Sequence, residues 1–252
     1  MDISKYLERI NYHGSLEPTV ETLQALHEAH LLAVPFENLD IALGREIVLD
    51  EAALWRKIVD HHRGGFCYEL NGLFVLLLRA LGFQVDMLSA EVAGSTGEFG
   101  PEFDHMTLLV HLEQNWIADV GFGDSFRRPL LLQADLAQPQ DWGSYRLVRE
   151  GASWIYQEWD GAWKPAYRFS LQPRELGDFV DMCHYQQTSP ESHFTQQRVC
   201  SLAKPSGRIT LSDQRLITTR VDGRTERVLT DQEYRVVLAE QFGIVLSPMN
   251  NE

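Results

Sequence analysis

Cys67 lies at the predicted start of a helix, a position that favours a reactive thiol. Cys67 follows two glycines in the run Arg63-Gly64-Gly65-Phe66-Cys67, and the apolar residues over 67–81 predict a buried helix that begins at the cysteine. A helix N-terminus stabilises a thiolate, and cysteine pKa values at such positions fall to roughly 3.5–7.5. Much of the sulfur is then expected to be ionised near neutrality. The alternative for this motif alone is a small buried hydrophobic side chain, the usual role of a free cysteine.

Two later segments supply the partners that a cysteine nucleophile needs. His105 opens a predicted strand over 105–110, and Asp119 lies in a second predicted strand over 116–123 that ends in glycines. Cys, His and Asp in this order form the constellation of cysteine-nucleophile enzymes. In it a neutral imidazole takes the thiol proton, and the carboxylate behind the ring fixes its tautomer and stabilises the imidazolium. A carboxylate instead of an asparagine favours a standing thiolate–imidazolium pair.

Whether His105 and Asp119 meet depends on the turn between their strands. Paired residues of an antiparallel hairpin have a constant sum of residue numbers, so these two are opposite only if the turn centres on Leu112. A turn at Gln114-Asn115, the stronger turn formers, would separate the pair by about 13 Å at ~3.4 Å per residue. Asp124 would then compete as the partner of His105. The sequence leaves both arrangements open, although His105 and Asp119 share a face in either.

The composition is that of a globular chain without a membrane span. The sequence has 252 residues, 44% of them hydrophobic, which suffices for one compact unit or for two to three small subdomains that share a core. Its longest apolar stretch, Leu73–Leu78, is far shorter than the roughly 20 residues that cross a bilayer. The first residues lack the charged and apolar regions of a signal peptide. We therefore predict a cytoplasmic protein with no membrane partner.

The sequence has three cysteines and a formal net charge of −14, which bear on disulfides, metal binding and nucleic-acid binding. An odd and sparse cysteine count argues against a disulfide framework and fits a reducing compartment. Cys183 and Cys200 lack the paired spacing of a zinc site, so no metal is predicted. The negative charge argues against nucleic acid as a partner, because a surface that follows phosphates needs clustered Lys and Arg.

Helical patterns come first along the chain and strand patterns follow. The predicted helices cover 2–32 in two segments, 51–61, 67–81, and a last segment with Thr230 as N-cap and Glu233 as its capping-box partner that ends near Phe242. The predicted strands cover 85–92, 105–110, 116–123, 145–148, 154–157, 209–211, 215–221 and 224–229, the last two joined by Asp222-Gly223. This order predicts an α+β fold.

Five segments together resemble the arylamine N-acetyltransferases. They are Pro35-Phe36-Glu37-Asn38-Leu39, Arg63 to Cys67, His105, Asp119-Val120-Gly121-Phe122-Gly123, and Gln187-Thr188-Ser189-Pro190 through Phe194. Each segment alone is weak, but the ordered set is highly specific and runs from about Tyr6 to Leu246. The resemblance implies acetyl-CoA as the acyl donor. It also implies arylamines, arylhydrazines and hydrazides as acceptors for N-acetylation, and often N-hydroxyarylamines for O-acetylation.

The resemblance also implies roles for individual residues. Cys67 would accept the acetyl group in a ping-pong reaction, His105 would act as its base and Asp119 would orient the imidazole. Phe36 and Phe122 would form walls of the acceptor pocket.

Glu37 and Arg63 belong to the matching segments as well. An ion pair between them would fix the Pro35 loop against the turn before the nucleophile, because Arg binds carboxylates in bidentate geometry. Direct contact of these two side chains with the substrate is the alternative.

The implied architecture has three parts around a cysteine-protease-like catalytic core. A helical domain over 1–83 would carry the nucleophile, a β-barrel-like domain over 84–185 would carry His105 and Asp119, and a small α/β lid would cover 186–252. The site would lie where the first two parts meet, which is a usual place for a cleft.

Coenzyme A is an anion, so an acidic chain needs a local basic patch to bind it. The candidates are Arg127-Arg128, Lys204 and Arg208, each equally well explained as solvated surface charge. Three other functions stay open. The same residues serve cysteine hydrolases and transglutaminases, which need an open groove, and related acyltransferases or amide synthases that use another acyl donor. A non-catalytic binding module is disfavoured, because a scaffold does not require Cys, His and Asp in this order.

Overall fold

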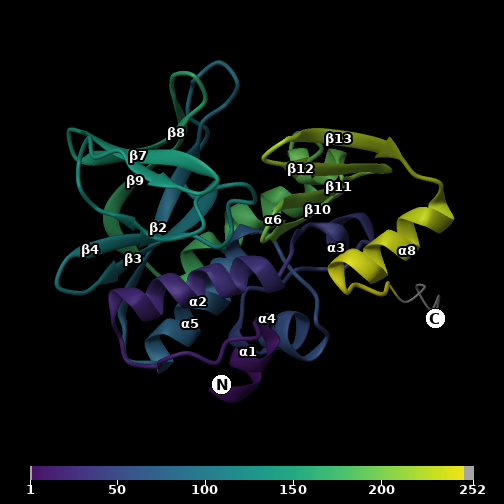
Figure 1. The fold of residues 1–252 in the computed structure, drawn as a ribbon, viewed down its shortest axis with the longest axis horizontal. Coiled ribbons are helices and arrows are strands. Elements are labelled where there is room, and N and C mark those ends of the chain that lie inside the picture. The colour runs from purple at the N-terminus through teal and green to yellow at the C-terminus, as the bar shows by residue number, and fades with distance from the viewer. Residues whose placement is uncertain (1, 247–252) are drawn as a thin grey trace.

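Helices and sheets occupy separate regions of the computed structural model, which describes residues 2–246 and confirms the predicted α+β fold. Figure 1 shows the N-terminal helices, in purple and blue, running beneath two sheets. The teal sheet on one side curls into a barrel, and the yellow-green sheet on the other side carries the C-terminal helix. Among residues 2–246 no helix is both long and apolar enough to cross a membrane.

The N-terminal part is helical because polar caps begin its helices and apolar stripes bury them. The Thr19 side chain accepts the Thr22 N–H at the start of the second helix, and Asp50 accepts the Ala53 N–H at the start of the fourth. The predicted helix over 51–61 ends in a π-helical segment rather than a regular α-helix. The helices of this part are α1 (Ile3–Arg9), α2 (Val20–Ala33), α3 (Leu39–Ala42), α4 (Glu51–Trp55), the π-helical η1 (Arg56–Asp60) and α5 (Cys67–Ala80).

An eight-stranded antiparallel sheet forms a nearly closed barrel beside these helices (Figure 1). Its strands are ordered β5-β4-β3-β2-β9-β8-β7-β6, and a bridge from Ala134 to Leu147 connects the segment after β5 with β7. Large side chains such as Phe126, Tyr156 and Tyr167 fill its interior. The strands are β2 (Gln84–Val92), β3 (His105–His111), β4 (Asn115–Ala118), β5 (Leu130–Leu131), β6 (Gln138–Gln140), β7 (Gly143–Glu150), β8 (Ser153–Trp159) and β9 (Trp163–Arg174).

The second sheet joins the C-terminal part to the N-terminal part. Strand β1 (Phe36–Glu37) comes from the helical region and pairs with β10, where Phe36 is opposite Ser201. The C-terminal helix begins at Thr230, whose side chain and that of Glu233 form the predicted capping box. The other elements are the 3-10 helix η2 (Leu176–Phe179), α6 (Val180–Thr188), α7 (His193–Gln196), β10 (Val199–Lys204), β11 (Gly207–Ser212), β12 (Arg215–Arg220), β13 (Gly223–Val228) and α8 (Asp231–Phe242).

Three apolar cores lie in these regions. One is centred on α2 and α5, one fills the barrel, and one lies between β10, β11 and α8. The division into 1–83, 84–185 and 186–252 stays a prediction, and α6 runs across its second boundary.

Strand β9 and helix α6 were not predicted, because their local sequences do not show the pattern of a regular strand or of an amphipathic helix. Strand β9 contains Pro165 and Pro173, and proline usually marks an edge or an irregularity in a strand. The β8–β9 pairing is indeed irregular, with a register shift between Tyr156 and Gln157. Helix α6 is polar on most sides and therefore lacks an apolar period.

Candidate active site

The cysteine lies at the first position of α5, as predicted, because two glycines let the preceding chain pack closely. A Cβ atom on Gly64 would lie 1.9 Å from the Pro35 carbonyl oxygen, which is shorter than any tolerable contact. Gly65 forms a parallel bridge with Phe36, and its carbonyl accepts the Glu37 N–H at 2.8 Å. The turn before Cys67 is therefore held directly against the loop that contains Phe36.

Cys67 is only 3% exposed, and the surroundings of its thiol oppose a lone thiolate. Burial raises its pKa well above the usual range, and the charges of Asp104 and Asp119 raise it further. The Met106 backbone N–H lowers it, but to a smaller extent. The expectation that the helix terminus alone ionises the sulfur is therefore wrong. A thiolate at this position needs a base that accepts the proton and stays beside it.

His105 and Asp119 form a buried pair, and the charge of Asp119 acts on the Cys67 thiol. His105 Nε2 lies 2.7 Å from Asp119 Oδ2, and both side chains are almost inaccessible to solvent. Burial works against the charge of Asp119, but His105 and further hydrogen bonds outweigh it and lower the pKa of the carboxyl. Because Nε2 is bound to the carboxylate, Nδ1 is the ring nitrogen left for proton exchange.

The β3–β4 register explains how this pair forms. Leu108 is opposite Ala118, so the hairpin centres on Glu113, between the two turn positions considered from the sequence. Asp119 follows the end of β4 and lies two positions from the residue opposite His105, on the same face. Diagonal neighbours of this kind are within reach of each other's side chains. The competing carboxylate of Asp124 instead accepts a hydrogen bond from Arg208 at 2.8 Å.

A tight contact brings the segment after β4 against the nucleophile. A Cβ atom on Gly121 would lie 2.8 Å from Cys67 Cα and 2.7 Å from Asn71 Nδ2. Only glycine allows this approach, so the conformation of the Asp119–Gly123 segment depends on the absence of a side chain there.

Asn71 is a site residue that sequence reasoning missed. Its Nδ2 donates to Asp119 Oδ1 at 2.9 Å and to the Met106 carbonyl at 2.7 Å, while its Oδ1 accepts the Val120 N–H at 2.9 Å. It follows Cys67 by four residues and so lies on the same face of α5. A buried polar residue at that spacing, within an apolar helix, was the available signal.

Aromatic rings surround the His105–Asp119 pair. The Phe122 ring lies 5.0 Å from His105 and 5.0 Å from Tyr167, and Tyr167 in turn lies 5.1 Å from His105, all between ring centroids. Phe36 belongs to a second aromatic group, 6.2 Å from Phe194. Phe36 and Phe122 thus lie in different groups, and their role as pocket walls stays a prediction.

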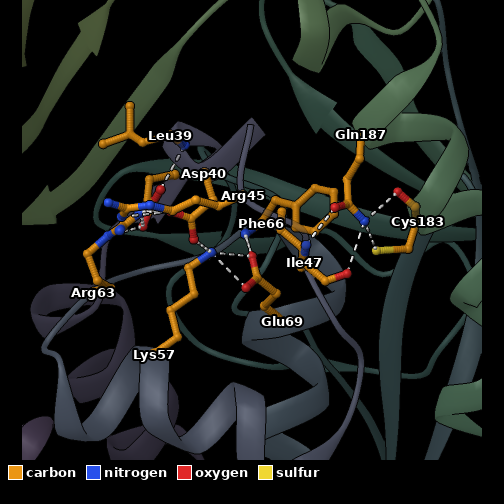
Figure 2. A network of polar contacts seen from close by, with 11 residues as sticks. Leu39, Asp40, Arg45, Ile47, Lys57, Arg63, Phe66, Glu69, Cys183 and Gln187 are labelled. Atoms are coloured by element: carbon orange, nitrogen blue, oxygen red, sulfur yellow. Dashed lines mark hydrogen bonds and ion pairs between the residues drawn. The ribbon is translucent and has the colours of Figure 1, made fainter. Parts of the chain in front are cut away.

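The Glu37–Arg63 ion pair is present. Arg63 also belongs to a larger network with Asp40 and Lys57 (Figure 2). Arg63 donates from Nε to Glu37 Oε1 at 2.8 Å and from Nη2 to Asp40 Oδ1 at 3.0 Å. The Glu37 side chain is fully buried, and its other oxygen accepts the Leu39 N–H at 2.8 Å. The pair therefore holds the loop after Phe36 to the turn before the nucleophile.

Lys57 extends the network to the start of α5. Figure 2 shows its ammonium between Asp40 and Glu69, at 2.9 and 2.7 Å. Burial opposes the charge of Lys57, but the surrounding carboxylates outweigh it and raise its pKa. Glu69 also accepts the Phe66 N–H at 3.1 Å, so this network fixes the residue directly before Cys67.

Most of the basic residues considered for coenzyme A make structural contacts. Arg127 donates to the carbonyls of Lys204 and Gly207 at 2.9 and 2.5 Å, which ties the barrel to the second sheet. Arg208 pairs with Asp124, whereas the Arg128 side chain stays 43% exposed. Within residues 2–246, no group of three or more His, Cys, Asp or Glu side chains is arranged to hold a metal ion.

The chain resembles known proteins over nearly its whole length. A family model described as N-acetyltransferase matches residues 19–251. The arylamine N-acetyltransferase of Escherichia coli is 38% identical over 249 residues, which cover 96% of this chain and 88% of the relative. A Salmonella typhimurium protein named arylamine N-acetyltransferase / N-hydroxyarylamine O-acetyltransferase is 42% identical over 212 residues, which cover 82% of this chain and 75% of the relative.

Solved structures give the same result in three dimensions. The arylamine N-acetyltransferase from Salmonella typhimurium superposes with a TM-score of 0.93 at 37% identity, covering 99% of this chain and 93% of that one. The Mycobacterium marinum arylamine N-acetyltransferase in complex with CoA superposes with a TM-score of 0.89 at 33% identity, covering 96% and 93%.

Proposed function

The chain belongs to the arylamine N-acetyltransferase family, and we propose that it transfers acetyl from acetyl-CoA to arylamines, arylhydrazines or N-hydroxyarylamines through an acetyl-cysteine at Cys67. The observation that carries this proposal is the buried 2.7 Å His105–Asp119 pair, whose carboxylate charge acts on the Cys67 thiol and whose following segment packs on Cys67 at Gly121. Relatives named arylamine N-acetyltransferases are acyltransferases, and the enzyme class follows from family membership.

In the first half-reaction the Cys67 proton moves to His105 Nδ1, and the sulfur attacks the thioester carbonyl carbon of acetyl-CoA. The carbon–sulfur bond to coenzyme A then breaks. The departing thiolate of coenzyme A takes this proton from His105 and leaves as the free thiol. The acetyl group remains on Cys67, His105 is neutral again, and the proton that began on the Cys67 thiol has left with coenzyme A.

In the second half-reaction a neutral amine attacks the acetyl-cysteine carbonyl. His105 removes the amine proton as the nitrogen–carbon bond forms, and the Cys67 thiolate leaves and recovers that proton. A weakly basic amine suits this step because it is uncharged near neutral pH and can enter an apolar site. The rings around His105, with Phe122 foremost, support an aromatic acceptor.

The electrostatics of the site support proton transfer within the pair. Because burial raises the pKa of the Cys67 thiol, an isolated thiolate is disfavoured. Transfer to His105 creates a close pair of opposite charges instead of one buried charge, and Asp119 stabilises the imidazolium half.

Family membership favours this proposal over a peptide hydrolase or a transglutaminase. Those enzymes need a groove that admits a polypeptide, whereas the relatives of this chain are named arylamine N-acetyltransferases. Acyltransferases with another acyl donor keep the same residues and are separated by the choice of acyl donor in the assay. A cytoplasmic location also stays a prediction, supported by the three cysteines, which are all free thiols.

The test is release of free coenzyme A thiol from acetyl-CoA, with and without an arylhydrazine or 5-aminosalicylate. We expect acceptor-dependent release from the wild type that disappears in Cys67→Ser. Cys183→Ser is the matched control, because Cys183 is equally buried and is not part of the proposed pair, and it should retain release. Equal release from the wild type and Cys67→Ser would overturn the proposal.

A further inference from the structure

One buried imidazole joins the two ends of the loop that carries the candidate carboxylate. His27, in α2, is fully buried, and its Nε2 accepts the backbone N–H of Asp119 at 3.0 Å. Its Nδ1 lies 2.8 Å from the carbonyl oxygen of Arg127. We call residues 119–127 the carboxylate loop. His27 thus bridges the first and last residues of this loop, about a hundred positions away in sequence.

The two hydrogen bonds fix the state of the ring. A carbonyl oxygen only accepts, so Nδ1 of His27 carries a proton, and a backbone N–H only donates, so Nε2 is unprotonated. Burial lowers the pKa of His27 to about 4, against the opposite effects of the Arg127 carbonyl and Asp119. The ring therefore stays neutral, in one tautomer, across the physiological pH range. Phe126 stacks on it at 5.7 Å between centroids, with 14° between the planes.

The carboxylate loop holds several groups at the site. Asp119 binds His105, Phe122 packs on the same imidazole, and Asp124 pairs with Arg208. The Arg127 guanidinium anchors the far end to the second sheet. The direction of the Asp119 carboxylate depends on the position of the Asp119 backbone. His27 helps to set that position, because it binds the Asp119 N–H directly.

We propose that His27 is a positioning residue that holds the carboxylate loop, and with it Asp119, in the geometry that lets His105 take the Cys67 proton. The proposal rests on the proposed roles of Cys67, His105 and Asp119. His27 touches neither the sulfur nor a substrate in this account. It acts through the backbone of Asp119, since a shift of about 1 Å in a reacting group can cost a hundredfold in rate.

The chain offers a matched control on the same helix. His30 lies one turn further along α2, is also fully buried, and bonds Tyr6 through Nδ1 at 2.9 Å. Its ring packs on Phe74, as the His27 ring also does. In the described part of the chain His30 Nε2 has no hydrogen-bond partner, so replacing His30 perturbs the same core without removing a bond to Asp119.

The experiment measures how fast iodoacetamide alkylates Cys67 between about pH 5 and pH 9, which brackets the titration of an ordinary histidine. Peptide mass spectrometry assigns the modified sulfur, and thermal unfolding is recorded for every variant. His27→Phe keeps the stacking but loses both hydrogen bonds. His27→Gln keeps a donor and an acceptor in one side chain. His30→Phe is the control, and His105→Gln tests the base itself.

We expect His27→Phe to slow alkylation of Cys67 by about 10- to 100-fold and to displace its pH profile, with His27→Gln recovering most of the loss. His30→Phe should stay within about threefold of the wild type, even if it lowers the unfolding temperature as much. A wild-type profile in His27→Phe, or an equal loss in His30→Phe, would overturn the inference.

Two further outcomes separate this inference from the proposed function. If His105→Gln slows alkylation and His27→Phe does not, only the role of His27 fails. If His105→Gln leaves alkylation unchanged, the proposed pair fails and the inference fails with it. If His27→Phe does not fold, the ¹⁵N shifts of the His27 ring in the wild type test the inference instead. A proton on Nε2, or titration of the ring between about pH 5 and pH 9, would contradict the inference.

Discussion

His105 Nε2 lies 2.7 Å from Asp119 Oδ2 although the two residues are not opposite each other in the β3–β4 hairpin. Asp119 follows the last residue of β4 and reaches His105 diagonally across one face. Its second oxygen accepts a hydrogen bond from Asn71, and its backbone N–H is bound by His27. The carboxylate is therefore held from three sides, and the hairpin alone does not position it.

Replacing this carboxylate with an amide should remove most of the activity. In Asp119→Asn the imidazolium loses its counter-charge and the amide can present N–H to Nε2, which favours the wrong tautomer. We expect kcat/KM for acetyl-CoA and an arylhydrazine to fall by about 10³- to 10⁴-fold. Asp124→Asn is the control, since that side chain is 75% exposed, and it should lose less than about tenfold. Similar losses in both variants would argue against a special role of Asp119.

The close packing of Gly121 against the nucleophile predicts that this site does not tolerate a methyl group. Gly121→Ala would place Cβ 2.8 Å from Cys67 Cα, so either the loop or α5 must move. We expect a loss of about 1–3 kcal/mol in the free energy of unfolding, as for other overpacked sites, and a fall in kcat of about a hundredfold. Gly177→Ala, whose Cβ would meet nothing within 4 Å, should change neither value appreciably. An active and stable Gly121→Ala variant would show that the approach is dispensable.

The buried Glu37–Arg63 pair should matter more for stability than an exposed pair of the same kind. Arg63→Ala leaves the fully buried Glu37 carboxylate with fewer partners, and breaking such a pair costs about 3–5 kcal/mol. Arg215→Ala removes an exposed partner of Glu226 and should change the free energy of unfolding by less than about 0.5 kcal/mol. Urea unfolding of both variants measures the difference. A loss below about 1 kcal/mol for Arg63→Ala would place the role of Arg63 elsewhere, such as in substrate contact.

Acid should destabilise the protein partly through His27. The folded-state pKa of about 4 lies below the ordinary value of 6.5, so the unfolded state binds more protons between these values. The contribution of the neutral ring is present above pH 6.5 and is lost as the pH falls towards 4. The difference between the two pKa values corresponds to about 3 kcal/mol. His27→Gln should therefore lose less stability than the wild type between pH 7 and pH 4 in urea unfolding, and parallel losses would contradict this.

Local signals in the sequence sufficed for many of the helices and strands, though not for β9 or α6, and for the order of the chemical groups. Cys67 does begin α5, and Thr230 with Glu233 does form a capping box, because both features depend on only a few neighbouring residues. The α+β fold follows from the same kind of local pattern.

Non-local features were beyond that reasoning. The hairpin turn centres on Glu113, whereas the turns considered from the sequence were at Leu112 and at Gln114-Asn115. Strand register depends on the packing of the whole barrel, which local turn signals do not contain. The direction of the Cys67 pKa was wrong for a similar reason. The helix terminus is local, whereas burial and the charges of Asp104 and Asp119, which oppose it, depend on segments distant in sequence.

The partners of Asp119 were missed because they come from distant segments. Asn71 and His27 lie in α5 and α2, far from β4 in sequence, and polar residues inside apolar helices have many structural explanations. Only the fold brings them to one carboxylate.

The central claim is that Cys67 carries the acetyl group, and the most direct test is to trap it there. The wild type is mixed with acetyl-CoA without an acceptor, quenched in acid, digested and analysed by mass spectrometry, and the same mixture is then chased with an arylhydrazine. We predict one acetyl group on the peptide that contains Cys67, which the hydrazine removes as the acetylated product forms. An acetyl group on another residue, or coenzyme A release with hydrazine while Cys67 stays unmodified in the acceptor-free sample, would contradict the account.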